Sequence, residues 1–165
     1  MELSPVFLHI FHNKIERVLH IKGNFTGPVL EMALVMDYRI PAKQMQESVG
    51  ALLRCLKQQS EVFRNVRFNV IDWRSDSEIT TKVCPMLSAV TEGFYQDYEQ
   101  IEEAKRIEKL YQYLKFYHAR SKLVLLITDG QYRIENEAEK EAALKPFLGR
   151  KLIEIKITEK GIELG

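Results

Sequence analysis

Three apolar runs along the chain each reach an aspartate at or near their end. They predict buried strands at Leu30–Met36, Val66–Trp73 and Lys122–Thr128, with the acids Asp37, Asp72 and Asp129. Apolar residues occupy consecutive positions in Met32–Met36 and Leu123–Ile127, as in strands that are covered on both faces. Such strands are typical of parallel sheets. Val66–Trp73 fits this pattern less cleanly, because Arg67 and Asn69 lie between its apolar residues.

Helical spacing of apolar side chains separates these strands. It predicts one helix from about Ala42 and a long helix from about Gly93 to His118. Asn136 followed by Glu139 is the N-cap pattern of a further short helix.

The two ends of the chain and one internal stretch have β-like patterns. Val6–Phe11 and Ile15–Lys22 flank a short polar turn and predict an antiparallel hairpin at a sheet edge. Lys151–Thr158 predicts the last strand, and Ile162–Leu164 a tail or an edge strand. Ile79–Leu87 fits either a short edge strand or an irregular loop.

Together these elements predict an α/β fold with a mainly parallel central sheet flanked by helices and joined by right-handed crossovers. The length of 165 residues suits a single domain. We expect an edge hairpin over 1–27, an α/β core over 28–158 and a tail over 159–165.

Composition narrows the classes of function. The chain has 24 basic and 23 acidic residues and a net charge of +1, which argues against a nucleic-acid binder or a surface drawn to anionic membranes. No run approaches the ~20 apolar residues of a membrane helix, and the N-terminus has no signal-peptide pattern. We therefore expect a cytoplasmic protein. The sequence leaves its oligomeric state open.

The carboxyl ends of parallel strands meet at one edge of the sheet, where open α/β sheets place their functional crevice. Asp37 after the first buried strand, and Ile127–Gly130 (Ile-Thr-Asp-Gly) at the end of the third, resemble the motifs of von Willebrand factor A-type domains. In that family the first strand ends in Asp-x-Ser-x-Ser and a later strand in (Thr/Ser)-Asp-Gly. With a threonine from an intervening loop, these residues form a metal-ion-dependent adhesion site. The resemblance implies ligand binding at this crevice.

The first motif departs from the family pattern. Arg39 and Pro41 stand where the family has two metal-ligating serines, so both hydroxyl ligands are missing. We therefore expect no cofactor. The alternative is a Mg²⁺ site formed by Asp37, Asp129 and one loop threonine, which is Thr80, Thr81 or Thr91. Our hypothesis is that the Arg39 guanidinium takes the place of the ion and bridges Asp37 and Asp129.

A hydrolytic alternative starts from the same acids. Asp37, Asp72 and Asp129 would form a metal-dependent site for phosphate-ester hydrolysis if their strand ends were adjacent and no cation lay among them. However, the sequence shows neither a general base nor an activating group, so we expect no enzymatic activity.

The preferred interpretation is a non-catalytic protein-interaction module of von Willebrand factor A type. It would bind a protein partner, without a bound metal, at the carboxyl ends of the parallel strands. Arginine and tyrosine are enriched at interfaces, and an arginine-rich rim suits an acidic partner. The expected binding residues are Asp37, Tyr38, Arg39, Arg74, Asp129, Gln131, Tyr132 and Arg133.

Overall fold

The structure, a computed structural model, describes residues 4–19, 31–59, 67–84, 97–147, 151–159 and 161–164. The strands are β1 (Glu31–Asp37), β2 (Arg67–Trp73), β3 (Ile79–Cys84), β4 (Leu123–Thr128), β5 (Leu152–Thr158) and β6 (Gly161–Leu164). The helices are α1 (Pro5–Leu19), α2 (Ala42–Gln59), α3 (Ile107–His118), α4 (Glu137–Leu144) and the 3-10 turn η4 (Lys145–Phe147).

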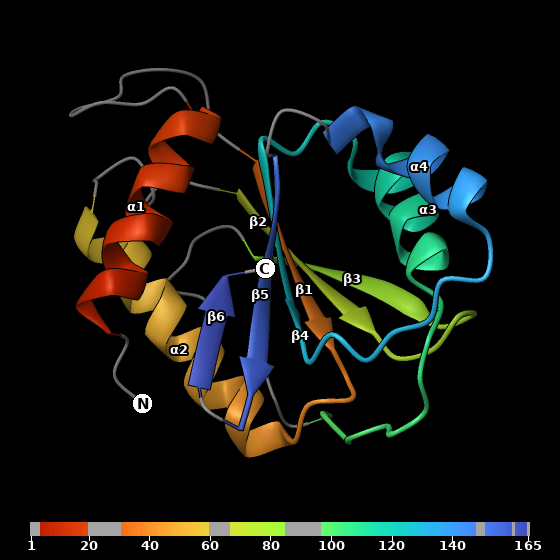
Figure 1. Ribbon diagram of the computed structural model, residues 1–165, viewed down its shortest axis with the longest axis horizontal. Helices are drawn as coiled ribbons and strands as arrows, with labels where there is room; N and C mark the ends of the chain where they lie inside the picture. The colour runs from red at the N-terminus through yellow and green to blue at the C-terminus, as the bar shows by residue number, and fades with distance from the viewer. Residues whose placement is uncertain are drawn as a thin grey trace.

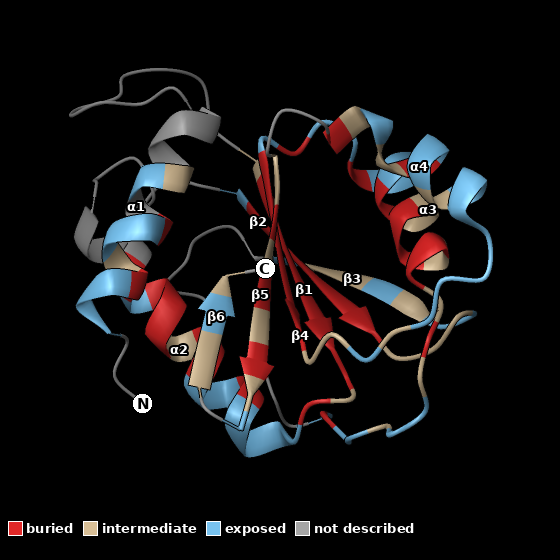
Figure 2. Ribbon diagram, viewed as in Figure 1, coloured by how far each residue is buried: buried red, intermediate tan, exposed pale blue. Residues whose placement is uncertain are grey.

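These strands form one mixed sheet in the order β3-β2-β1-β4-β5-β6 (Figure 1). Strands β1, β2, β4 and β5 run parallel, while β3 and β6 are antiparallel to their neighbours. The α/β class and the mainly parallel sheet are as predicted. The central strands are buried almost throughout (Figure 2), as the consecutive apolar residues of β1 and β4 indicated.

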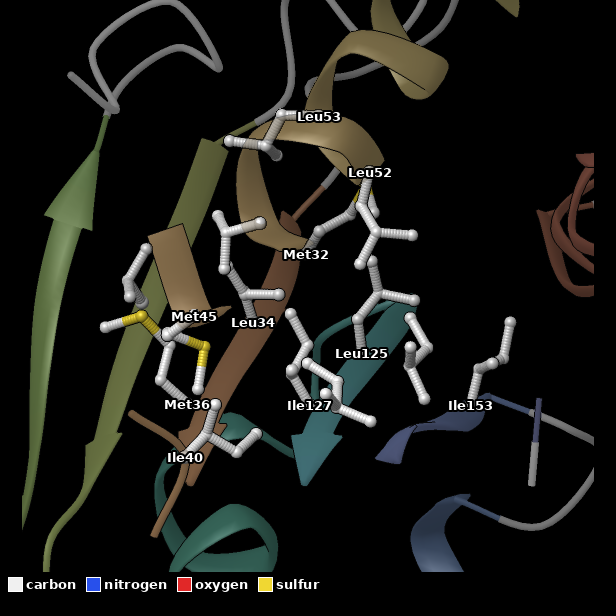
Figure 3. Close-up of a cluster of buried hydrophobic side chains, with 14 of the residues drawn as sticks. Met32, Leu34, Met36, Ile40, Met45, Leu52, Leu53, Leu125, Ile127 and Ile153 are labelled. Carbon is white, nitrogen blue, oxygen red and sulfur yellow. The ribbon is translucent and has the colours of Figure 1, made fainter. Parts of the chain in front are cut away.

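Helices cover both faces of the sheet, and β1 supplies side chains to both. Met32, Leu34 and Met36 point to the face covered by α1 and α2, where Met45 and Leu52 pack against the sheet (Figure 3). The intervening β1 residues pack on the other face with α3 and α4. The sheet is therefore packed on both faces, and this packing positions its carboxyl-terminal edge.

The N-terminal hairpin prediction is wrong, because residues 5–19 form helix α1. The Ser4 hydroxyl accepts a hydrogen bond from the Phe7 N–H at 3.1 Å, and Pro5 occupies the first helical position, so Ser-Pro starts the helix. Phe7 and Phe11, four residues apart, stack at 5.6 Å and are buried against the sheet. The remainder of the predicted hairpin lies outside the described residues.

The long helix predicted over 93–118 is also wrong in its first half, because α3 begins only at Ile107. Residues 97–106, which we call the strap, run without helix across the carboxyl-terminal edge of the sheet. Residues 93–96 lie outside the described residues. Tertiary hydrogen bonds replace helical ones in the strap, for example from the Ile101 N–H to the Tyr38 carbonyl at 2.8 Å.

Three further predictions can be compared with the structure. The Asn136 side chain caps α4 by accepting from the Glu139 N–H at 3.1 Å, as expected. The stretch that fitted either a strand or a loop forms β3 up to Cys84. Residues 161–164 form an edge strand paired with β5 and not a tail. Among the described helices, none is long and apolar enough to cross a bilayer.

Candidate functional site

The strand order brings the predicted acids together. Strand β1 lies between β2 and β4, so the ends that carry Asp37, Asp72 and Asp129 are neighbours at one edge of the sheet. Five residues that contact one another there form what we call the strand-end cluster: Asp37, Arg39, Lys105, Thr128 and Asp129.

Asp37 is the centre of this cluster and is fully buried. Its Oδ2 accepts a hydrogen bond from the Thr128 hydroxyl at 2.6 Å, which joins the ends of β1 and β4. Its Oδ1 accepts from the Arg39 backbone N–H at 3.0 Å and from the Lys105 ammonium group. Both carboxylate oxygens are therefore occupied by donors from the protein itself.

Lys105 supplies the positive charge that compensates Asp37. The lysine is 2% exposed, and its Nζ lies 4.7 Å from the centroid of the Trp73 ring. The ammonium thus contacts a carboxylate and the face of an indole, which both attract cations. Sequence reasoning missed this residue. Lys105 lies outside the apolar stripe of the helix predicted over 93–118, which includes its neighbour Ala104, and no local signal marks the lysine as buried.

The Arg39 guanidinium pairs with Asp129 and does not bridge the two acids. Its Nε lies 2.9 Å from Asp129 Oδ2, and it also donates to the Glu102 carbonyl of the strap. Only the backbone N–H of Arg39 reaches Asp37. The hypothesis that Arg39 bridges Asp37 and Asp129 is therefore wrong. Lys105 compensates the charge of Asp37, and Arg39 that of Asp129.

Asp72, the third strand-end acid, has its own cations. The carboxylate is fully buried, and its Oδ2 lies 3.3 Å from Lys82 Nζ and 3.6 Å from an Arg74 nitrogen. Burial, followed by the negative charge of Asp72, raises the pKa of Tyr38 to about 12. The Tyr38 hydroxyl therefore stays protonated at neutral pH.

A cleft of about 460 Å³ opens beside the strand-end cluster. It lies between the turn after β2, the end of the strap and the segment after β4, and is lined by Arg74, Ser75, Asp76, Ser77, Glu103, Ala104, Lys105 and Arg133. Arg133 is the more exposed of its two arginines, at 53% of its side chain against 20% for Arg74. Two of the predicted binding residues thus line a concave surface.

The predicted tyrosines do not contribute to this surface. Tyr38 is 2% exposed and stacks on Tyr98 at 4.1 Å between ring centroids. The Tyr132 hydroxyl donates to the Glu154 carboxylate at 3.0 Å, and its ring lies near Trp73. Gln131 is exposed, but it is not among the residues that line the cleft.

Of the metal ligands proposed as an alternative, Asp37 and Asp129 lie at neighbouring strand ends, but the candidate threonines within the described residues lie on another strand. Thr80 and Thr81 lie on β3, and the Thr81 hydroxyl is hydrogen-bonded to Tyr113 at 2.6 Å and His118 at 3.0 Å. Thr91 lies outside the described residues. Within the described part of the chain, no group of three or more His, Cys, Asp or Glu side chains is arranged to hold a metal ion.

No protein-family model matches the chain, and no curated protein matches it. The functional proposal therefore depends on the contacts at the strand ends.

Proposed function

We propose that the chain is a non-catalytic protein-interaction module of von Willebrand factor A type, with a degenerate metal site. It binds a protein partner at the carboxyl ends of the parallel strands and uses no bound metal. The observation that carries the proposal is the pairing of Asp37 with Lys105 and Thr128, which gives each carboxylate oxygen a hydrogen-bond donor from the chain itself.

The pairing of the strand-end acids argues against hydrolysis. A general base must be free to accept a proton, and a metal site needs several free oxygens. Asp37, Asp72 and Asp129 instead each face at least one lysine or arginine of the chain. The cations that the hydrolytic arrangement must exclude are therefore present.

The chemistry of the cleft favours an acidic partner. Arg133 makes ion pairs with Glu135 at 3.0 Å and Asp76 at 3.8 Å, both partly exposed. A carboxylate of the partner can replace either one, because exposed pairs contribute little stability and exchange readily. Ser75 and Ser77 add hydroxyl groups beside the arginines.

Affinity capture from the native cell tests the proposal with two matched variants. Arg133→Glu reverses the charge at the cleft, while Arg120→Glu makes the same change on an exposed residue before β4, at the opposite edge of the sheet. We expect a partner that is captured in stoichiometric amount by the wild type and Arg120→Glu and is lost with Arg133→Glu. A chelator should leave capture unchanged.

Other results would replace this proposal by an alternative. Capture that disappears with a chelator indicates the metal-dependent form of the same module. Hydrolysis of a generic phosphate ester that is abolished by Asp37→Asn indicates the hydrolase. Equal capture by all three proteins places the partner elsewhere.

A further inference from the structure

The buried Asp37 carboxylate requires a cation, because an unpaired charge in a protein interior is strongly destabilising. The family that the strand-end motifs resemble meets such a requirement with a divalent ion. In this chain the partner is the Lys105 ammonium, which is itself almost fully buried.

A divalent ion does not fit among these side chains. Magnesium needs near-octahedral coordination by about six oxygens. One oxygen of Asp37 is held by the Thr128 hydroxyl and the other by Lys105, and Arg39 occupies Asp129. Two fixed positive charges would also repel a metal at this position.

Lys105 also belongs to the strap, which is hydrogen-bonded to other parts of the chain at several positions. The Tyr98 hydroxyl donates to the Ile40 carbonyl at 2.6 Å, and the Arg106 N–H donates to Asp76 at 2.7 Å. The Arg133 N–H donates to the Lys105 carbonyl at 2.7 Å. The strap therefore holds the ammonium in place on both sides of the lysine, and little conformational entropy remains to be lost when the ion pair forms.

We propose that Lys105 is the resident cation of the strand-end cluster, a covalently tethered replacement for a divalent ion. Its ammonium neutralises Asp37 permanently and keeps the strap closed over the strand ends. A partner carboxylate then has no metal to coordinate, and it docks at the arginines of the neighbouring cleft. That last statement rests on the proposed function, whereas the cation role of Lys105 does not.

Thermal melting of Lys105 variants tests the cation role without a partner. Lys105→Met keeps most of the aliphatic stem and removes the charge, while Lys105→Ala leaves space for a small cation. We expect each to lower Tm by about 10 °C, because each leaves a buried carboxylate unpaired. Lys115→Ala, on an exposed lysine of α3, should melt like the wild type.

Added cations provide the decisive readout. Propylammonium has the atoms that Lys105→Ala removes, so it should raise the Tm of this variant saturably by several degrees, as ligand linkage requires. Mn²⁺, given access to Asp37 and Thr128, should do the same. Neither cation should change the Tm of the wild type, Lys115→Ala or Lys105→Met by more than sodium chloride of equal ionic strength does.

A double variant that removes both charges tests the same inference if Lys105→Ala does not fold. Asp37→Asn combined with Lys105→Met removes both charges and should melt above Lys105→Met alone. The inference is overturned if Lys105→Met melts with the wild type, or if propylammonium does not raise the Tm of a folded Lys105→Ala. It is also overturned if the double variant melts no higher than Lys105→Met, or if Mn²⁺ stabilises the wild type saturably. None of these results depends on partner capture, so failure here is distinguishable from failure of the proposed function.

Discussion

Two buried carboxylates of this protein are stabilised in opposite ways. Asp37 in the strand-end cluster is held mainly by side chains from distant elements, the ammonium of Lys105 and the hydroxyl of Thr128. Glu108, at the start of α3, is held by the main chain. Its Oε2 accepts from the backbone N–H groups of Glu135 at 3.0 Å and Asn136 at 2.6 Å.

The difference indicates which carboxylate is open to functional change. Glu108 fixes the turn before α4 to the start of α3, and Arg106 adds an ion pair at 3.5 Å. We call these four residues, Arg106, Glu108, Glu135 and Asn136, the helix-junction cluster. A backbone N–H donor is kept by every substitution except proline, whereas any substitution of Lys105 removes the ammonium on Asp37. In the strand-end cluster, one substitution is therefore enough to remove the cation from the buried carboxylate.

The largest effect is expected for Asp37→Ala. It leaves the Lys105 ammonium buried without its carboxylate, and breaking a buried pair in this way costs about 4 kcal/mol in the free energy of unfolding. Urea unfolding measures the loss. Adding Lys105→Met should restore part of the stability, because the orphaned charge is then removed. Asp97→Ala, at an exposed aspartate, is the control and should stay within about 0.5 kcal/mol of the wild type.

Glu108→Ala is expected to cost about 3 kcal/mol in the free energy of unfolding, because it leaves two backbone N–H groups in part-buried positions without their acceptor. Glu108→Gln keeps an acceptor oxygen and should cost less. Unlike Asp37→Ala, this loss should not be relieved by removing the neighbouring cation with Arg106→Met. Urea unfolding measures this. If adding Arg106→Met restored part of the lost free energy of unfolding, Glu108 would depend on a side-chain cation in the same way as Asp37.

The central strands could be predicted because burial on both faces leaves a direct trace in the sequence. A continuous apolar run such as Leu123–Ile127 has few other stable positions in an α/β fold. The adjacency of Asp37 and Asp129 followed from the rule that parallel strands end at one edge. Ser4 followed by Pro5 is a helix-start pattern that the sequence also contains. The prediction nevertheless favoured a strand, because a short apolar run follows these two residues.

Lys105 could not be predicted, because its partner Asp37 lies 68 positions away. Its own neighbours, Ala104 and Arg106, suit an exposed helical turn, and apolar spacing extended the predicted helix across the strap. Tertiary contacts decided otherwise. The strap forms hydrogen bonds with the turns after β1 and β2 and with the segment after β4, and these partners come together only in the folded chain.

Arg39→Ala should have a smaller effect than Asp37→Ala, about 1 kcal/mol. The pair with Asp129 is partly exposed, at 22% and 23% of the two side chains, and solvent screens such pairs. The substitution also removes the guanidinium contact to the Glu102 carbonyl. A loss in urea as large as that of Asp37→Ala would show that Arg39, and not Lys105, is the main cation of the strand-end cluster.

The smallest expected effect is a difference in pH dependence at the helix-junction cluster. Burial alone would raise the pKa of Glu108, but hydrogen bonds from the backbone, notably from Asn136 and Glu135, together with Arg106 outweigh it and lower that pKa. The ionised form is therefore favoured in the folded state. Its contribution to stability is fully present above the ordinary pKa of 4.5 and is lost as the pH falls below that value.

Glu108→Gln should remove this contribution, because an amide does not titrate in this range. Urea unfolding of the wild type and Glu108→Gln between pH 7 and pH 3 measures the difference. The wild type should have the larger free energy of unfolding. Its advantage over Glu108→Gln should be constant near neutral pH and should shrink as the pH falls below the ordinary carboxyl pKa. A gap that widens on acidification would mean that burial dominates over the backbone donors. Glu108 would then behave as an unpaired buried acid, and not as a carboxylate that backbone N–H groups stabilise.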